Sequence, residues 1–328
     1  MSDSTTLVTG ATGMVGNAIV RELLVRKRKV RALVRDVDRA AGVVPKGCEL
    51  ARGDVTVPAT VREALADCEV VYHAAGLPEQ WLKDPTTFDS INVEGTRNVV
   101  EAALAAKVRR FIYTSTIDVF PIRPGVEFDE SKVDPDPKHT YYERSKQRAD
   151  SLVTEALGRG LPAVFLHPSG VYGPGPAGSP GLVRAIAQLA RGEVPLLLPG
   201  SIPVVFVDDV GVGHVLAEEK AAVGERFILH ESSHTLADFA VQVREVAGRG
   251  KVPRVLPVWF ARAFAAVGET LAYATGKPPI VARGQVQFLQ LHARPSSRRA
   301  QERLGWKPRG FRDGLRQTMA WLQETGEL

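Results

Sequence analysis

The sequence predicts an α/β fold, a Rossmann-type doubly wound parallel sheet followed by a smaller C-terminal lobe. From residue 5 to about 167, short apolar runs alternate with helical patterns, as in right-handed β-α-β units. A glycine-rich loop follows the first apolar run, and a cluster of Gly and Pro at 173–176 ends the alternation. We therefore expect an NAD(P)-binding domain over 1–167. Residues 168–328 should form a mainly substrate-binding lobe, with some segments returning to the sheet.

Each element is predicted from its own pattern. The first domain should contain six strands, at 5–9, 30–34, 49–52, 70–73, 110–114 and 163–167. The helices between them have apolar residues recurring at intervals of three and four, at 14–27, 61–66, 95–106 and 144–157. In the lobe we expect a helix at 182–191, a strand at 204–207, helices starting near 210 and 235, and a C-terminal helix at 313–322.

Composition narrows the functional class. With 328 residues, 44% of them hydrophobic, the chain can bury a large core. The net charge of +5 includes a basic run at 26–31, which lacks interleaved aromatic residues and indicates a solvated surface rather than a nucleic-acid site. Cys48 and Cys68 have neither metal-ligand nor disulfide spacing, so no metal is expected. The N-terminus shows no signal-peptide pattern, and we expect a cytoplasmic protein.

The most membrane-like stretch is 258–274. It contains Arg262 and Glu269 and is too short to span a bilayer, so a buried helix or a lid is favoured over a membrane anchor. Peripheral membrane contact remains the alternative. Its aromatic residues, with Tyr273 among them, could equally cover a pocket or form the contact of the homodimer that we expect.

The glycine-rich loop directly follows the first strand and opens a helix, which is the context of a dinucleotide site. One glycine permits the tight turn, one lets the backbone approach the pyrophosphate, and one allows close packing of the helix. The helix N-terminus adds amide donors and positive potential. The predicted contacts in this loop are Gly10, Thr12, Gly13, Met14, Val15 and Gly16.

The end of the second strand bears on the cofactor. A carboxylate there would bind the ribose 2'-hydroxyl of NAD, but this chain has Val34 followed by Arg35. An arginine suits a 2'-phosphate, so NADP is favoured and NAD remains possible. Asp36 would reverse this choice if it pointed inward.

Further cofactor contacts are predicted at the ends of other strands. Asp54, with Val55 beside it, is placed to accept from the adenine amino group, although a turn or helix cap is the alternative. The small residues Ala74 and Ala75 would let a ribose lie against the backbone, whereas the preceding His73 is expected to be packed. The predicted contacts also include Pro168 and Val171, after the sixth strand.

Tyr142 and Lys146 are the candidate reacting pair. Residues four apart share one helix face, so the ammonium should lower the pKa of the phenol and make it a useful proton donor or acceptor. The same spacing recurs at Tyr273 and Lys277, but Gly276 and the following prolines should end the helix between them.

These motifs, in this order, resemble the extended short-chain dehydrogenase/reductase superfamily, the NAD-dependent epimerase/dehydratase fold, over nearly the whole chain. The resemblance implies that Thr116, rather than its neighbour Ser115, holds the substrate oxygen. It also implies that Tyr142 is the acid/base and that Lys146 contacts both the phenol and the nicotinamide ribose. The supporting stretches are N-V-E-G-T-R-N at 92–98, F-I-Y-T-S-T at 111–116, V-F-V-D-D-V at 205–210 and R-R-A-Q-E-R-L-G-W-K-P at 298–308.

Within that superfamily the chain looks like the branch of dihydroflavonol reductases, 3β-hydroxysteroid dehydrogenases and hopanoid-associated epimerase-like proteins. It has L-H-P-S-G at 166–170 and G-S-I-P at 200–203, where enzymes acting on nucleotide sugars carry an Arg-x-x-Asn sequence and an arginine. Without that arginine clamp a diphosphate is poorly held, which implies a smaller, apolar substrate.

The predicted function is therefore NADP(H)-dependent reduction of a ketone or aldehyde, or oxidation of the matching alcohol. Loops at 77–88, 118–140 and 170–180 should face the nicotinamide, and their aromatic residues, Trp81, Phe88, Phe120 and Phe128, line either a pocket or the core. Two alternatives remain: a sugar epimerase or dehydratase that retains its NAD, and a non-catalytic NADP-binding protein.

Overall fold

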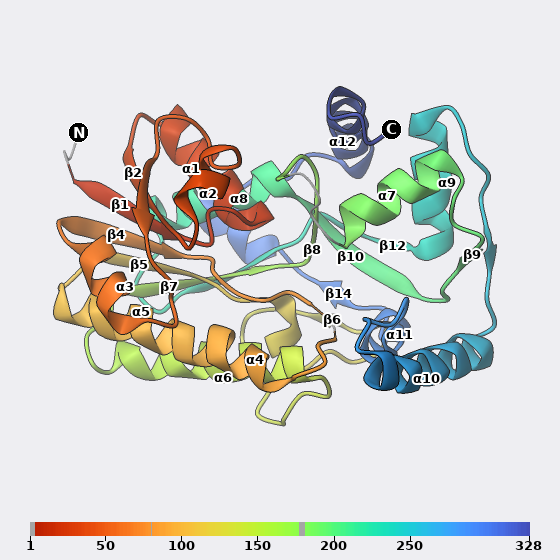
Figure 1. Ribbon diagram of the computed structural model, residues 1–328, viewed down its shortest axis with the longest axis horizontal. Coiled ribbons are helices and arrows are strands. Elements are labelled where there is room, and N and C mark those ends of the chain that lie inside the picture. The colour runs from red at the N-terminus through yellow and green to blue at the C-terminus, as the bar shows by residue number, and fades with distance from the viewer. Residues whose placement is uncertain (1–3, 80, 177–180) are drawn as a thin grey trace.

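The computed structural model describes residues 4–79, 81–176 and 181–328. Its centre is a seven-stranded parallel sheet with the order β11-β7-β5-β4-β1-β2-β3 (Figure 1), so the predicted fold class is confirmed. The strands are β1 (Thr5–Thr9), β2 (Lys29–Val34), β3 (Glu49–Arg52), β4 (Cys68–His73), β5 (Arg110–Thr114), β7 (Ala163–Pro168) and β11 (Arg226–Leu229).

All six strands predicted within residues 1–167 are present, and the sheet has one further strand. The seventh, β11, comes from the second half of the chain and pairs in parallel with β7. The sequence pattern did not single out this four-residue strand. Helix α8 (Val207–Lys220) precedes β11 and packs on the sheet, so both elements return from the lobe to the nucleotide domain.

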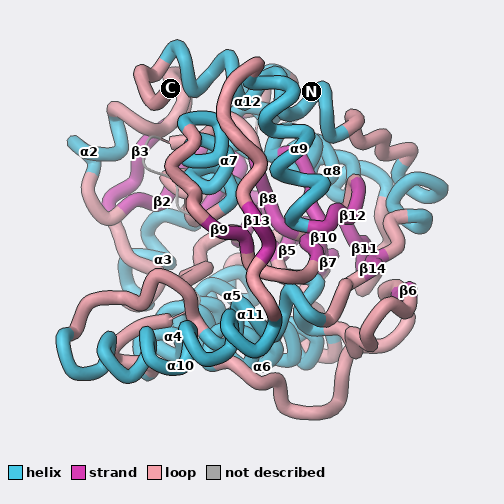
Figure 2. Tube along the Cα trace, turned by 90° about the vertical axis from the view of Figure 1, so that its right-hand side faces the viewer, coloured by secondary structure: helices cyan, strands magenta, loops and turns pink. Residues whose placement is uncertain are grey.

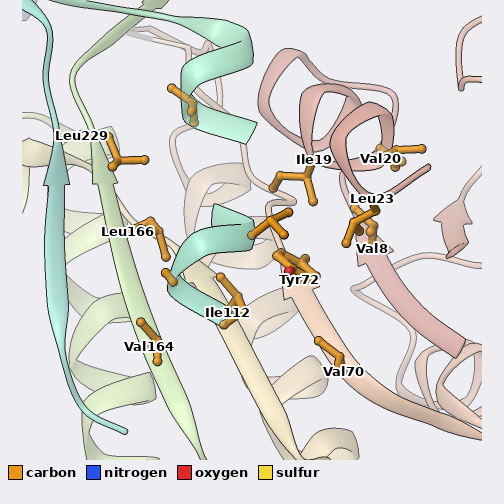
Figure 3. Close-up of a cluster of buried hydrophobic side chains, with 14 of the residues drawn as sticks. Val8, Ile19, Val20, Leu23, Val70, Tyr72, Ile112, Val164, Leu166 and Leu229 are labelled. Carbon is orange, nitrogen blue, oxygen red and sulfur yellow. The ribbon is translucent and has the colours of Figure 1, made fainter. Parts of the chain in front are cut away.

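Helices cover both faces of the sheet. Figure 1 shows α1 (Met14–Val25) and α8 on one face and α3 (Pro58–Leu65), α5 (Gly95–Ala105) and α6 (Tyr141–Leu157) on the other. Successive strand residues point to opposite faces, and accordingly Leu7 joins one hydrophobic cluster and Val8 the other. Figure 3 shows side chains of α1 pointing toward those of the strands, with Leu229 of β11 in the same cluster.

The second lobe has its own core. A three-stranded sheet, in the order β12-β10-β8, lies beside the helices of the lobe (Figure 2). The core between them contains Tyr172, Phe206, Phe239 and Phe311. Its elements are β8 (Gly170–Tyr172), α7 (Leu182–Arg191), β10 (Ser201–Phe206), β12 (Ser232–Thr235), α9 (Leu236–Ala247) and α12 (Phe311–Glu324). The predicted helices are present, whereas the predicted strand at 204–207 lies earlier because Val207 begins α8.

The remaining elements are short or peripheral. They are α2 (Val37–Ala41), α4 (Thr86–Phe88), β6 (Glu127–Phe128), β9 (Leu196–Leu197), β13 (Arg254–Val255), α10 (Val258–Thr275), α11 (Arg283–Gln290), β14 (Arg294–Pro295), a 3-10 turn η2 (Ile117–Val119) and π-helical segments η1 (Asp89–Glu94) and η3 (Ala300–Leu304).

A buried carboxylate joins α8 to the amino ends of the strands. Glu218, 4% exposed, accepts from the Tyr72 hydroxyl at 2.7 Å and pairs with Arg28 at 3.2 Å and with Arg109 at 2.9 Å. Burial would raise the pKa of Glu218, but the hydrogen bonds from Tyr72 and Arg28 outweigh it and hold that pKa below its ordinary value. Arg28 belongs to the basic run at 26–31, so this part of the run is a structural ion-pair site.

We predict that Glu218→Gln lowers the free energy of unfolding at pH 7 by about 2 kcal/mol, because two arginines lose their buried counter-charge. Since the folded-state pKa is lowered, this stabilisation is present above the unfolded pKa and is lost as pH falls through the folded pKa. The gap between wild type and variant in urea unfolding should therefore close in acid. Glu219→Gln is the control, because Glu219 is exposed and its pair with Arg26 should contribute less than about 0.5 kcal/mol. Equal losses in the two variants would contradict the assignment.

Candidate functional site

The predicted nucleotide loop has the geometry of a phosphate cradle. Gly10 has φ +75°, and the turn is closed by Gly13 N donating to Gly10 O at 2.9 Å. Helix α1 then begins with no side-chain cap and no acidic residue in its first turn. The first-turn amides of Met14, Val15 and Gly16 are thus available to an anion, as a pyrophosphate requires.

The glycines of this loop also allow close packing. A Cβ on Gly10 would lie 2.7 Å from the backbone of Ala74, which follows β4, and a Cβ on Gly16 would lie 2.2 Å from Gly10 O. Real Cβ atoms do not approach backbone this closely, so both positions require glycine. The loop is therefore fixed against the end of β4, beside Ala74 and Ala75, where a ribose was expected.

Arg35 is exposed just beyond β2, and Val34 before it is buried. The Asp36 carboxylate accepts from the Arg39 amide at 3.1 Å and caps α2. The residue that could have reversed the preference for NADP is therefore used in capping.

Asp54 is held in a turn. One of its carboxylate oxygens accepts from both the amide and the hydroxyl of Thr56 at 2.8 Å, which matches the capping alternative for this residue. The neighbouring Val55 is buried, and its carbonyl accepts from Asn98 at 2.9 Å. Contact of Asp54 with adenine stays a prediction, with one carboxylate oxygen already engaged.

His73 is packed, as expected. It is fully buried between the hydroxyls of Thr9, at 2.7 Å, and Thr96, at 2.9 Å. Burial lowers the pKa of His73 to about 3, so the ring stays neutral at physiological pH. It connects the ends of β1 and β4 and offers no proton for catalysis.

The structure brings Thr116, Tyr142 and Lys146 together. A capping box of Thr140 and Glu143 starts α6 at Tyr141, which places Tyr142 and Lys146 one helical turn apart. Lys146 is 8% exposed and donates to the carbonyl of Thr114, at the end of β5, at 2.9 Å. Thr116 is the second residue after β5, and its hydroxyl adjoins the Tyr142 phenol.

The hydrogen-bond partners of the two hydroxyls distinguish Thr116 from Ser115 as the residue beside the phenol. The Ser115 hydroxyl donates to the buried carboxylate of Asp150 at 2.7 Å, and Asp150 also pairs with Arg226 at 2.8 Å. Ser115 is therefore part of a structural network, and Thr116 is the residue of this pair that reaches the phenol.

The predicted lowering of the Tyr142 pKa is not seen. Burial, with the nearby carboxylate of Asp118, raises that pKa above its ordinary value, although the Thr116 contact acts in the opposite direction. Lys146 directs its ammonium to Thr114 O, and burial lowers its own pKa to about 8. The phenol is consequently kept protonated, as a proton donor must be.

Sequence reasoning missed Asp118. The Thr116 hydroxyl donates to its carboxylate at 3.0 Å, and the Asp118 amide donates back at 3.3 Å. Burial, together with the charge of Glu143, raises the Asp118 pKa to about 7, against the lowering effects of Thr116, Lys138 and Lys146. The signal available in the sequence was a lone carboxylate two residues after Thr116, which has no recognisable motif of its own.

The second Tyr-x-x-x-Lys sequence does not form a comparable pair. Helix α10 ends at Thr275, and Gly276 has φ +73°, so Lys277 lies outside the helix that carries Tyr273. The predicted helix end is confirmed.

The aromatic residues of the predicted substrate loops divide between core and site. Phe120 is fully buried in a cluster with Ile117 and Val119, whereas Phe88 contacts the Tyr142 ring edge-on at 6.4 Å between centroids. In the 77–88 loop, Glu79 Oε2 and Trp81 Nε1 are buried without a hydrogen-bond partner, and such atoms are candidates to bind a polar substrate group.

The last two predicted cofactor contacts, Pro168 and Val171, lie where the chain passes from the main sheet to the small sheet. Pro168 ends β7 and is buried, and Val171 lies in β8, which pairs with β10. Of the expected 170–180 segment, residues 177–180 lie outside the described residues.

Comparison with known proteins identifies the family and the fold. The family model described as the NAD dependent epimerase/dehydratase family matches residues 6–229. "Sterol demethylase protein B" of Methylococcus capsulatus is 30% identical over 329 residues, covering 99% of this chain and 100% of that protein. "3 beta-hydroxysteroid dehydrogenase type 7" of Homo sapiens is 30% identical, covering 97% of this chain and 95% of that protein. Among solved structures, that of gox2253 has a TM-score of 0.87 at 34% identity, covering 99% of each chain.

We predict that Gly10→Ala abolishes nucleotide binding, because the added methyl group must displace the backbone at Ala74. Gly160→Ala is the matched control, since Gly160 also has a positive φ, +92°, but no atom within 4 Å of its added Cβ. The control should lose only about 1 kcal/mol of stability to left-handed strain and bind nucleotide as wild type does. Titration of NADPH by fluorescence, with thermal melts of both variants, provides the comparison; unimpaired binding by Gly10→Ala would contradict the cradle.

Proposed function

The chain belongs to the NAD-dependent epimerase/dehydratase family, and on that premise we propose that it is an NADP(H)-dependent oxidoreductase. It would reduce the ketone or aldehyde of a largely apolar substrate, or oxidise the matching alcohol. The observation that carries the proposal is the meeting of Thr116, Tyr142 and Lys146 at the carboxyl end of β5. Residues 1–167 would hold mainly the cofactor and residues 168–328 mainly the substrate.

The names of two relatives support a substrate of the sterol or steroid type. One is called a hydroxysteroid dehydrogenase and another a sterol demethylase protein, and both match this chain over nearly its full length. We extend from these names a substrate class for this chain, a polycyclic or similarly apolar alcohol or ketone.

Each residue of the site has a role in the proposed reaction. A bound reduced nicotinamide supplies a hydride to the carbonyl carbon. Tyr142, kept protonated by burial, donates its phenolic proton to the carbonyl oxygen, and the Thr116 hydroxyl donates a hydrogen bond to the same oxygen. The Lys146 ammonium stabilises the phenolate that remains.

Asp118 governs whether Thr116 can play this part. A hydroxyl has one proton to donate, and in the structure that proton goes to the Asp118 carboxylate. When Asp118 is protonated it can donate to Thr116 instead, which frees the Thr116 proton for the substrate. Reduction is thus favoured by the acid form of Asp118.

The region around Gly200 argues against a diphosphate-bearing substrate. Gly200 has φ +125°, and a Cβ there would lie 2.3 Å from Leu289 O, so an arginine at this position has no room. The family also contains nucleotide-sugar epimerases, but this chain does not supply a clamp at 200–203. An apolar substrate fits the site better.

NADP is the proposed cofactor because Arg35 is exposed at the end of β2 and Asp36 faces the Arg39 amide. A guanidinium can bind a 2'-phosphate with two hydrogen bonds. NADPH should therefore give a lower KM than NADH in the same assay.

We predict that Tyr142→Phe lowers kcat for NADPH-dependent ketone reduction by about 100-fold or more, because the proton donor is removed. The assay follows NADPH oxidation over a panel of steroid and other hydrophobic ketones and aldehydes. Tyr141→Phe is the control, since Tyr141 is its exposed neighbour and keeps its ring under Arg144. A Tyr142→Phe variant retaining more than about a tenth of the rate would exclude the assigned role. Silence across the panel, together with nucleotide-sugar isomerisation, would favour the epimerase alternative.

We predict that the wild-type reduction rate falls roughly fourfold from pH 6 to pH 7.5, as the acid form of a group with a pKa near 7 is lost. Asp118→Asn should flatten the profile in this range, because the amide does not ionise. The charged or titratable groups near Asp118 are Glu143, Lys138, Lys146 and Tyr142. Burial lowers the pKa of Lys146 to about 8, which is above this interval, and raises the pKa of Tyr142 above its ordinary value. An unchanged slope in Asp118→Asn would assign the pH dependence to another group.

A further inference from the structure

Helix α10 has its large apolar side chains on the outside. Its buried residues are alanines, Ala261, Ala265 and Ala272, whereas Trp259 is 71% exposed and Val267 is 61% exposed. A surface helix of a globular protein normally turns its large apolar residues inward. In Figures 1 and 2, α10 lies along the edge of the molecule beside α11, away from the main sheet.

The exposed side chains form one continuous stripe. Phe260, Phe264, Val267 and Leu271 follow one another at intervals of four, three and four, and all four are exposed. The turn after the helix extends the stripe to Ile280, which is 88% exposed, across a shallow hollow of about 250 Å³. A contiguous apolar surface of this kind marks an interaction site.

The same segment concentrates positive charge. Residues 249–283 contain six Lys or Arg and one Glu, a formal charge of +5, which equals the net charge of the whole chain. The remainder of the chain is therefore formally neutral. The only acid of the segment, Glu269, is paired with Arg283 at 3.3 Å. All six basic residues are exposed: Arg249, Lys251, Arg254, Arg262, Lys277 and Arg283.

We propose that α10 and the turn at 276–280 dock on the surface of an anionic lipid bilayer. The apolar stripe would enter the region between headgroups and acyl chains, and the basic residues around it would contact the headgroups. Among the described residues no helix is long and apolar enough to cross a membrane, so the helix would lie in the interface plane. Trp259 at one end of the helix is suited to this boundary, because its ring is amphipathic.

Charge disfavours a second copy of the chain as the occupant. A two-fold contact through the stripe would bring two segments of +5 face to face, and the apolar gain would be opposed by their repulsion. An anionic surface complements the same charge.

Docking in this orientation would place the candidate site near the bilayer. Tyr273, near the end of α10, contacts Trp81 with ring centroids 5.5 Å apart, and the charge of Glu79 in the same loop reaches Tyr142. An apolar substrate could then enter from the lipid. This last step rests on the proposed function, whereas lipid docking does not.

The test is co-sedimentation with vesicles of phosphatidylcholine, alone or with about 30% phosphatidylglycerol. We expect binding to the anionic vesicles, at least tenfold weaker binding to the neutral ones, and loss of binding at about 0.5 M salt. Val267→Glu should weaken binding at least tenfold. Val25→Glu is the matched control, because Val25 is also helical and is 76% exposed, but lies outside the segment.

Wild-type melting temperature and NADPH binding in Val267→Glu would show that the change is local. The proposal is overturned if wild type binds neither vesicle, if it binds both equally, or if Val267→Glu binds as wild type does. It is also overturned if ultracentrifugation shows a dimer that Val267→Glu dissociates while lipid binding is absent. Because these readouts need no turnover, a failed ketone assay would leave the lipid result intact.

Discussion

The burial of Glu218 is the constraint that joins the two halves of the chain into one folded unit. A carboxylate removed from water must be paired, and its partners lie at the amino ends of β2 and β5 and on β4. Helix α8 is thereby held against the sheet, where Gly211 lets it approach α1 closely. With α8 fixed, β11 pairs with β7, and the chain after β7 continues into β8, which pairs with β10.

At the carboxyl ends of the strands, burial sets the pKa values of the residues in the candidate site. It raises the pKa of Tyr142 and Asp118 and lowers that of Lys146. These shifts leave a protonated phenol, a carboxyl that titrates near neutrality, and an ammonium held by a backbone carbonyl. The site therefore combines an acid with a hydroxyl whose availability depends on its neighbour. Both features are consistent with the proposed protonation of a carbonyl oxygen.

The molecule distributes its apolar surface unevenly. The sheet and the small lobe each bury large side chains, and even Phe120, from a loop expected to face the substrate, lies in the core. Helix α10 does the reverse by burying alanines and exposing aromatic rings. Tyr273 of this helix contacts Trp81 in the 77–88 loop, with ring centroids 5.5 Å apart. The proposed apolar substrate and the proposed lipid docking therefore both involve this part of the molecule.

The sequence by itself determined what depends on local backbone and short spacing. The glycine loop, five of the six N-terminal strands to within a residue at each end, and the shared turn of Tyr142 and Lys146 need only neighbours in the chain, so pattern and steric preference predict them. Only the tertiary structure decided which hydroxyl lies beside the Tyr142 phenol. The Ser115 hydroxyl instead donates to Asp150, which is 35 residues away in the sequence. It also decided the role of Asp118, the capping use of Asp36 and the seventh strand. Burial and pairing with distant residues set these outcomes, and no local pattern encodes the identity of a distant partner.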